Sequence, residues 1–143
     1  MSPPAASNDA ILVADRLAVR FETAEGPVIA VDDVSFSVRP GEFLSIIGPS
    51  GCGKSTVFNV IGGLLGQHNG TVKVAGELID GPHKSIGMVF QEESTFPWRN
   101  VTDNVAFPLE LVGMPRAKRI ERARHFISLV GLTGFENRFP GEL

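Results

Sequence analysis

The chain has 143 residues, of which 43% are apolar and 20% charged, and its formal net charge is −3. This length suits one ordinary folded domain, and the composition excludes a disordered or fibrous protein. The acidic balance argues against a nucleic-acid partner held by phosphate neutralisation. A single cysteine excludes an internal disulfide, and no apolar run approaches the ~18 residues of a membrane span.

The residues before position 48 predict strands. Residues 1–8 lack the cationic start and apolar centre of a signal peptide and are expected to form a loose tail. Apolar side chains recur over residues 11–21, and residues 34–38 alternate strictly, as half-buried antiparallel strands do. Gly26 and Pro27 indicate a turn between them. Residues 43–47 are nearly all apolar, which predicts a central parallel strand covered on both faces.

A glycine-rich stretch, GPSGCGKST, follows that strand and precedes a helical pattern that fades at Gly66. It fits the phosphate-loop pattern G-x-x-x-x-G-K-[ST], in which inward-facing backbone N–H groups and a helix N-terminus surround phosphates. The lysine supplies charge to the β- and γ-phosphates, and the serine hydroxyl is placed to bind Mg²⁺. A glycine-rich turn with a chance lysine is the weaker interpretation in this context. The candidate nucleotide-binding residues are Gly48, Pro49, Ser50, Gly51, Cys52, Gly53, Lys54, Ser55 and Thr56.

The remaining residues predict a hairpin, a second buried strand and two helices. The hairpin covers residues 71–79 and the strand residues 86–90. Thr102 is the expected cap of the first helix, which Pro108 shortens or kinks. The second helix runs from about residue 115 to Gly131, and its basic residues 116–124 are interpreted as a solvated face.

Taken together, these motifs resemble the ATP-binding cassette (ABC) ATPases, the motor subunits of ABC transporters. The phosphate loop, Val89-Phe90-Gln91 as the family's Q-loop, and the segment from Phe96 to Val105 come in the family's order. The local sequence around Gln91 and Pro97-Trp98 most resembles that of importers of nitrate, sulfonates and taurine. The resemblance implies an α/β P-loop NTPase fold of ABC type. Residues 9–94 would form the N-terminal part of the nucleotide-binding domain, with an antiparallel β part and a mixed sheet core. Residues 95–143 would form the start of the helical subdomain.

The resemblance also implies roles for individual residues. Phe21 matches the aromatic residue that stacks on adenine, the alternative being a core residue at the end of its strand. Gln91 matches the glutamine that reaches Mg²⁺ and the attacking water, the alternative being an ordinary residue at a strand end. Trp98 is a candidate contact for the membrane partner or, alternatively, a buried anchor. The implied cofactors are ATP and Mg²⁺, with Ser55 and Gln91 as metal ligands.

The implied function is ATP-driven import of a small anion such as nitrate, a sulfonate or taurine. The expected partners are transmembrane permease subunits, a second ATP-binding subunit in a homodimer and, indirectly, a substrate-binding protein, but no nucleic acid. The protein would lie peripherally on the cytoplasmic face of the inner membrane. The alternatives are a soluble ABC ATPase outside transport and a nucleotide binder that does not hydrolyse ATP. A small P-loop kinase is disfavoured because 47 residues precede Gly48.

The resemblance ends at residues 139–143, which are similar to the approach to the family's signature sequence. The signature glycines, the Asp-Glu strand and the sensing histidine of the family have no counterpart here. Glu92 and Glu93 imitate the Asp-Glu pair, but their spacing from the loop fits the Q-loop instead. His68, His83 and His125 are out of register for the sensing histidine. The chain is therefore expected to be an N-terminal portion that binds ATP, has no catalytic residue and, on its own, is inactive and aggregation-prone.

Overall fold

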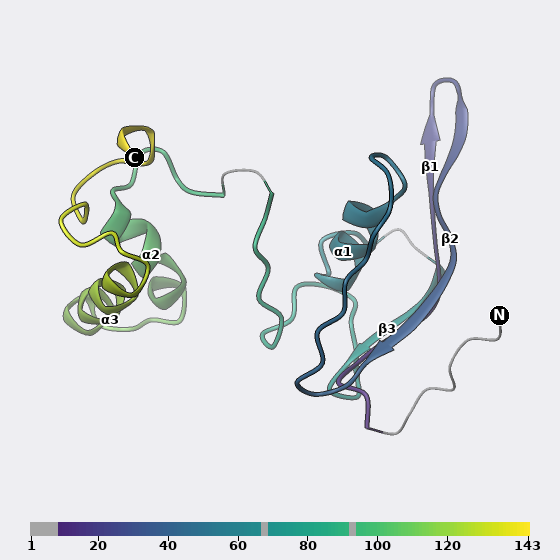
Figure 1. Ribbon diagram of the computed structural model, residues 1–143, viewed down its shortest axis with the longest axis horizontal. Helices are drawn as coiled ribbons and strands as arrows, with labels where there is room; N and C mark the ends of the chain where they lie inside the picture. The colour runs from purple at the N-terminus through teal and green to yellow at the C-terminus, as the bar shows by residue number, and fades with distance from the viewer. Residues whose placement is uncertain (1–8, 67–68, 92–93) are drawn as a thin grey trace. The chain divides into compact units, whose positions relative to one another are not determined.

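The computed structural model describes residues 9–66, 69–91 and 94–143, and the expected tail, residues 1–8, lies outside this description. The chain divides into two compact units, one up to Val89 and the other from Phe90 to Leu143. The first unit carries strands and one helix, and the second is helical (Figure 1).

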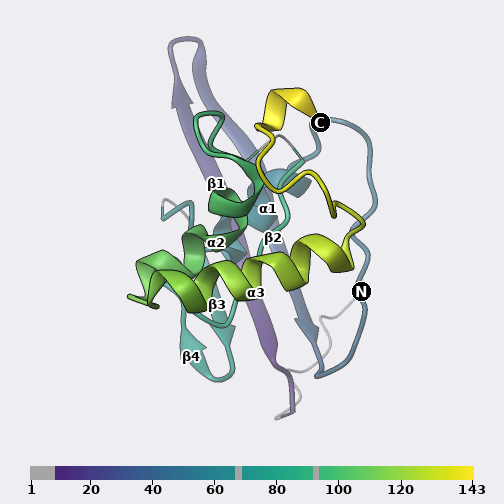
Figure 2. The same cartoon turned by 90° about the vertical axis from the view of Figure 1, so that its left-hand side faces the viewer.

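In the first unit, the described residues form a four-stranded antiparallel sheet. Strands β1 (Leu12–Thr23) and β2 (Gly26–Val38) form a long hairpin, and β3 (Asn69–Val74) and β4 (Glu77–Leu78) form a short one. The strand order is β2-β1-β3-β4 (Figure 2). The predicted antiparallel N-terminal strands and the short hairpin are thus confirmed.

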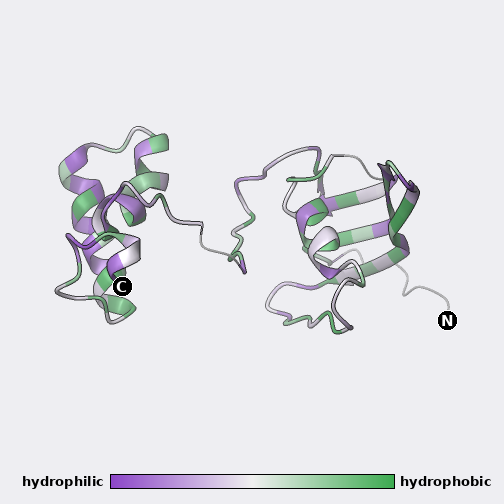
Figure 3. Ribbon diagram, turned by 90° about the horizontal axis from the view of Figure 1, so that it is seen from above, coloured by the Kyte–Doolittle hydropathy of each residue, from purple (hydrophilic) through white to green (hydrophobic). Residues whose placement is uncertain are grey.

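The core of this unit lies between the sheet and helix α1 (Lys54–Ile61). Hydrophobic and hydrophilic bands alternate along the strands (Figure 3), as expected for a sheet with one buried face. Leu17 is fully buried on β1, and Val57 and Val60 bring the apolar side of α1 into the same cluster. The helix expected after the phosphate loop is therefore present, and its apolar stripe fixes it against the sheet.

Two expected strands are not formed. Residues 43–47 and 86–90 belong to no strand, and Phe43 and Ile47 are each 92% exposed. A strand forms only by ladder hydrogen bonds to a neighbouring strand, and among the described residues neither segment has such a neighbour. The structure therefore corrects the expectation of a mixed sheet, because the described strands all pair antiparallel. The expected α/β fold is confirmed.

The second unit consists of α2 (Val101–Leu111), α3 (Arg116–Leu129) and a short 3-10 turn, η1 (Pro140–Glu142). The two helices lie side by side (Figures 1 and 2) and bury small and β-branched residues. These buried residues are Val101, Thr102, Ala106, Ala123 and Ile127. The predicted pair of helices is confirmed, and α2 continues through Pro108 for three more residues.

The cap of α2 differs from the expectation. Asn100 is the N-cap, and its side-chain oxygen accepts a hydrogen bond from the backbone N–H of Asp103 at 2.8 Å. Thr102 lies inside the helix instead, where its N–H and its hydroxyl both donate to the carbonyl of Glu136, at 3.0 and 2.9 Å. Thr102 therefore connects α2 to the segment after α3 by hydrogen bonds. Asn100 instead satisfies a free N–H group at the start of α2.

In the ranges that the structure describes, none of the helices combines the length and the apolar character needed to cross a membrane.

Gly70 and Gly76 test the architecture of the sheet. Both have a φ of +83°, but a Cβ on Gly70 would overlap the backbone of Asp15 and Arg16, whereas Gly76 faces open space. Gly76→Ala should lower the free energy of unfolding by about 1–2 kcal/mol, because alanine is strained at a positive φ. Gly70→Ala should lower the urea midpoint of unfolding further, because β1 must also move. Equal losses in the two variants would contradict the close approach of β3 to the bulge in β1.

Candidate nucleotide-binding site

The phosphate loop ends where α1 begins. Gly51 and Gly53 have φ of +78° and +92°, so the chain makes two left-handed steps before Lys54 opens the helix. Glycine adopts such angles without the steric penalty that a Cβ brings. Val57 N–H donates to the carbonyl of Gly53 at 3.0 Å, closing the first turn. The preceding N–H groups of the first turn have no acceptor within the helix, which is the arrangement that binds anions at helix N-termini.

The loop is seated directly on strand β2. A Cβ added at Gly53 would overlap the backbone oxygen of Ala30 and lie 3.4 Å from Cγ2 of Val31. A Cβ on Gly48 would lie 2.6 Å from Sγ of Cys52. Space, and not conformation alone, therefore requires glycine at position 53, whereas the neighbour of Gly48 is a side-chain atom that can shift. The contribution of Ala30 was not predicted, and the available signal was a small residue within the apolar run of residues 28–31.

Lys54 folds back over the loop. Its ammonium donates to the carbonyl of Gly48 at 2.8 Å and to that of Pro49 at 2.7 Å. The third N–H faces Sγ of Cys52 at 3.6 Å, a weak acceptor. A phosphate oxygen would be a much stronger acceptor for that N–H, because both partners would be charged. The ammonium of Lys54, the left-handed glycines and the free N–H groups at the start of α1 therefore belong to one loop.

The hydroxyl and thiol groups of the loop differ in exposure. Ser50, Cys52 and Ser55 are exposed, and Thr56 is half-buried beneath the first turn of α1. Among the described residues, no group of three or more His, Cys, Asp or Glu gathers in a way that would hold a metal. The exposed hydroxyl of Ser55 is an oxygen ligand of the kind that Mg²⁺ binds beside phosphate oxygens and water.

The turn before residues 43–47 is fixed by an acidic side chain. Gly41 has a φ of +75°, and the carboxylate of Glu42 accepts the backbone N–H of Arg39 at 2.7 Å. That hydrogen bond, more than the nearby guanidinium of Arg39, holds the pKa of Glu42 below its usual value. The chain therefore enters the segment before the loop from a defined turn.

The other predicted site residues lie apart from the loop in sequence. Phe21 is on β1, half-buried and packed against the core cluster, in the same unit as the loop. Gln91 is exposed and belongs to the second unit. Trp98 is 72% exposed, which favours an interface over a buried anchor. Glu92, Glu93 and His68 lie outside the described residues, whereas His83 contacts Glu77 at 3.0 Å and His125 is exposed.

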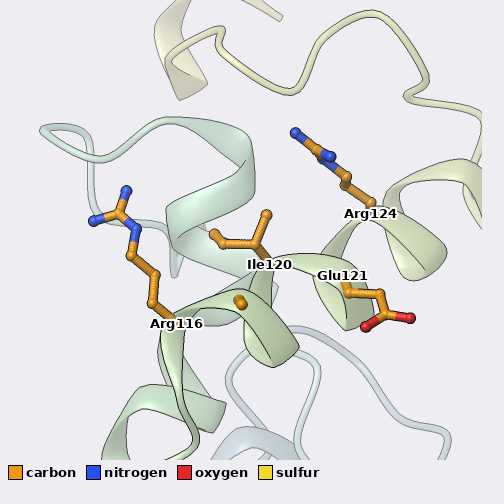
Figure 4. A pocket seen from close by; sticks show the side chains of 5 residues that line it. Arg116, Ile120, Glu121 and Arg124 are labelled. Carbon is orange, nitrogen blue, oxygen red and sulfur yellow. The ribbon is translucent and has the colours of Figure 1, made fainter.

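Helix α3 carries a shallow hollow with basic residues around it. Arg116, Ala117, Ile120, Glu121 and Arg124 line it. Figure 4 shows the guanidinium groups of Arg116 and Arg124 extending past Ile120, with the carboxylate of Glu121 turned away from both. These side chains are exposed or half-buried, as expected for the solvated helix face that the sequence indicates.

The fold and the loop find matches among known proteins. The sequence profile of the ABC transporter family matches residues 31–143. The chain belongs to the ABC transporter family. It is 44% identical, over 114 residues, to the taurine import ATP-binding protein TauB of Escherichia coli (strain K12) and to that of Shigella sonnei (strain Ss046). Each match covers 80% of this chain and 45% of the relative, so the chain spans about half the length of these ABC proteins.

Solved structures show the same ABC fold. The dimeric structure of the ABC transporter cassette MJ0796 superimposes with a TM-score of 0.82 at 28% sequence identity. The alignment covers 92% of this chain and 62% of that one. The same values hold for a dimeric post-hydrolysis state of MJ0796 bound to ADP and Pi.

The chain's single thiol offers a test of the site. Because Cys52 is exposed and lies beside the ammonium of Lys54, a nucleotide whose phosphates occupy the loop should cover it. Mg-ATP should slow labelling of Cys52 by a maleimide, measured by mass spectrometry over time. Equal labelling rates with and without Mg-ATP would contradict phosphate binding at this loop.

Proposed function

We propose that this chain is the ATP-binding part of an ABC importer that couples ATP binding and hydrolysis to uptake of a small anion such as taurine, a sulfonate or nitrate. The single observation that carries the proposal is the loop itself, seated on β2 through Gly53 with Lys54 folded over its carbonyls. The similarity to taurine import ATP-binding proteins supports the choice of substrate class.

Each residue of the loop would hold ATP in a definite way. Backbone N–H groups from Gly51 to Ser55 would surround the β-phosphate, and the free N–H of Lys54 would reach the β- and γ-phosphates. The hydroxyl of Ser55 would bind Mg²⁺, with Gln91 as a second ligand from the Q-loop. Phe21 would stack on adenine. Bound Mg²⁺ supplies charge neutralisation to the phosphates.

The assembly that we propose follows from the same family membership. Transmembrane permease subunits would receive the segment around Trp98, and a second ATP-binding subunit would complete the nucleotide site in a homodimer. A substrate-binding protein would act indirectly. The protein would lie peripherally at the cytoplasmic face of the inner membrane, with residues 9–94 as the nucleotide-binding part and residues 95–143 as the start of the helical subdomain.

A matched pair of lysine variants tests the proposal. Lys54→Ala removes the cation that faces the phosphates, whereas Lys73→Ala removes the same charge from an exposed position on β3. A charge-assisted hydrogen bond contributes about 1.5–3 kcal/mol, so Lys54→Ala should weaken Mg-ATP binding by roughly ten- to a hundredfold. Lys73→Ala should bind like the parent chain. The measurement is equilibrium binding of a fluorescent ATP analogue.

If Lys54→Ala keeps the parent affinity, the loop is not the binding site and the proposed function fails. If both variants lose affinity equally, net charge rather than the loop governs binding, which contradicts the proposal as well.

A further inference from the structure

The loop of residues 96–100, which carries Trp98, is fastened to α2 by one side chain. The side-chain oxygen of Asn104 accepts the backbone N–H of Phe96 at 2.7 Å. Its amide nitrogen donates to the carbonyls of Phe96 at 3.0 Å, Arg99 at 2.8 Å and Asn100 at 3.1 Å. The acceptor end thus meets an N–H and the donor end meets carbonyls, so the reversed amide orientation would lose every one of these bonds.

Side chains of the same loop add a second fastening. The guanidinium of Arg99 lies over the ring of Phe107 at 4.9 Å and pairs with Glu110 at 2.9 Å. The hydrogen bond from Arg99 is the main cause that holds the pKa of Glu110 below its usual value. Phe96 contacts Phe107 with ring centroids 4.7 Å apart in an edge-to-face arrangement. The residues on both sides of Trp98 are therefore held on α2.

Trp98 lies at the exposed edge of this packing. Its ring is 5.4 Å from that of Phe96 on one side, yet the residue is 72% exposed. An exposed indole on a loop whose backbone is fixed loses little conformational entropy on binding, which is how preorganisation increases affinity. Aromatic residues in such positions commonly anchor protein interfaces.

We propose that Asn104 is the positioning residue that holds the 96–100 loop in one conformation and so presents the Trp98 ring to a protein partner. The identification of that partner as a membrane subunit rests on the proposed function, whereas the positioning role does not. Asp, Ser or Ala at this position cannot donate to the carbonyls of Phe96 and Arg99 while also accepting the Phe96 N–H.

The control is a buried polar side chain of α2, Thr102. Thr102 donates through its hydroxyl to the carbonyl of Glu136, so it ties α2 to a different loop with a hydrogen bond of similar length. Thr102→Val removes that bond and leaves residues 96–100 untouched. A variant that merely destabilises the helical unit should therefore resemble Thr102→Val.

Trp98 is the chain's single tryptophan, so its fluorescence reports on this loop alone. In the full 143-residue chain, time-resolved anisotropy should show the amplitude of the fast component rising roughly twofold in Asn104→Ala, because an exposed side chain on a released loop reorients on the ps–ns timescale. Asn104→Asp keeps the size and the acceptor oxygen but loses the donors, and it should show the same direction of change. Thr102→Val should match the parent chain, with helical circular dichroism recorded for all.

Unchanged anisotropy in a folded Asn104→Asp variant would overturn the proposal, as would an equal increase in Thr102→Val. If Asn104→Ala does not fold, Asn104→Asp decides, because a carboxylate near a helix N-terminus favours the helix. The measurement needs neither nucleotide nor partner. A failure here therefore leaves the phosphate loop standing, and a failure of the lysine test leaves the positioning role standing.

Discussion

The close approach of Gly53 to the backbone of Ala30 is the constraint on which the nucleotide site depends. It fixes the phosphate loop to β2, and the left-handed turn at Gly53 then sets the direction in which α1 leaves the sheet. Lys54 follows immediately, so its ammonium returns over the loop carbonyls. β2 also pairs with β1, where Val28 lies opposite Phe21. Val28 is two residues, or about 7 Å, along β2 from Ala30, so one hairpin positions both the loop and the proposed adenine contact.

In the helical unit, side-chain contacts to a helix position a loop. Polar and aromatic contacts to α2 hold the loop of residues 96–100. Asn104 holds the loop backbone by hydrogen bonds. The guanidinium of Arg99 packs on Phe107 and pairs with Glu110. In the proposed function, the first unit would present backbone N–H groups to an anion, and the second would present an aromatic ring. Binding a nucleotide and binding a protein partner call for these two kinds of surface respectively.

Sequence reasoning predicted the features that depend on local pattern. The antiparallel hairpins, the helix after Gly53 and the helices on either side of Gly113 follow from periodicity and turn residues. It failed where the outcome depends on neighbours: residues 43–47 are apolar enough for a buried strand, but the described residues offer no strand beside them. It also named Thr102 as the cap where the structure has Asn100, because both residue types cap helices and the hydrogen bond from Thr102 to Glu136 is remote in sequence. The seat at Ala30 and the bonds of Asn104 are likewise contacts that no spacing rule reveals.

The central claim is that this chain recognises phosphates through the loop on β2, with the base as a secondary contact. Calorimetric titration with Mg-ATP, Mg-ADP and AMP tests it most directly, because the three ligands share the adenosine and differ in phosphate number. Affinity should fall from ATP to ADP, and AMP should bind at least roughly a hundredfold more weakly than ATP, since it lacks the phosphates that charged donors would reach. Equal affinity for AMP and ATP would contradict it and would assign recognition to the nucleoside.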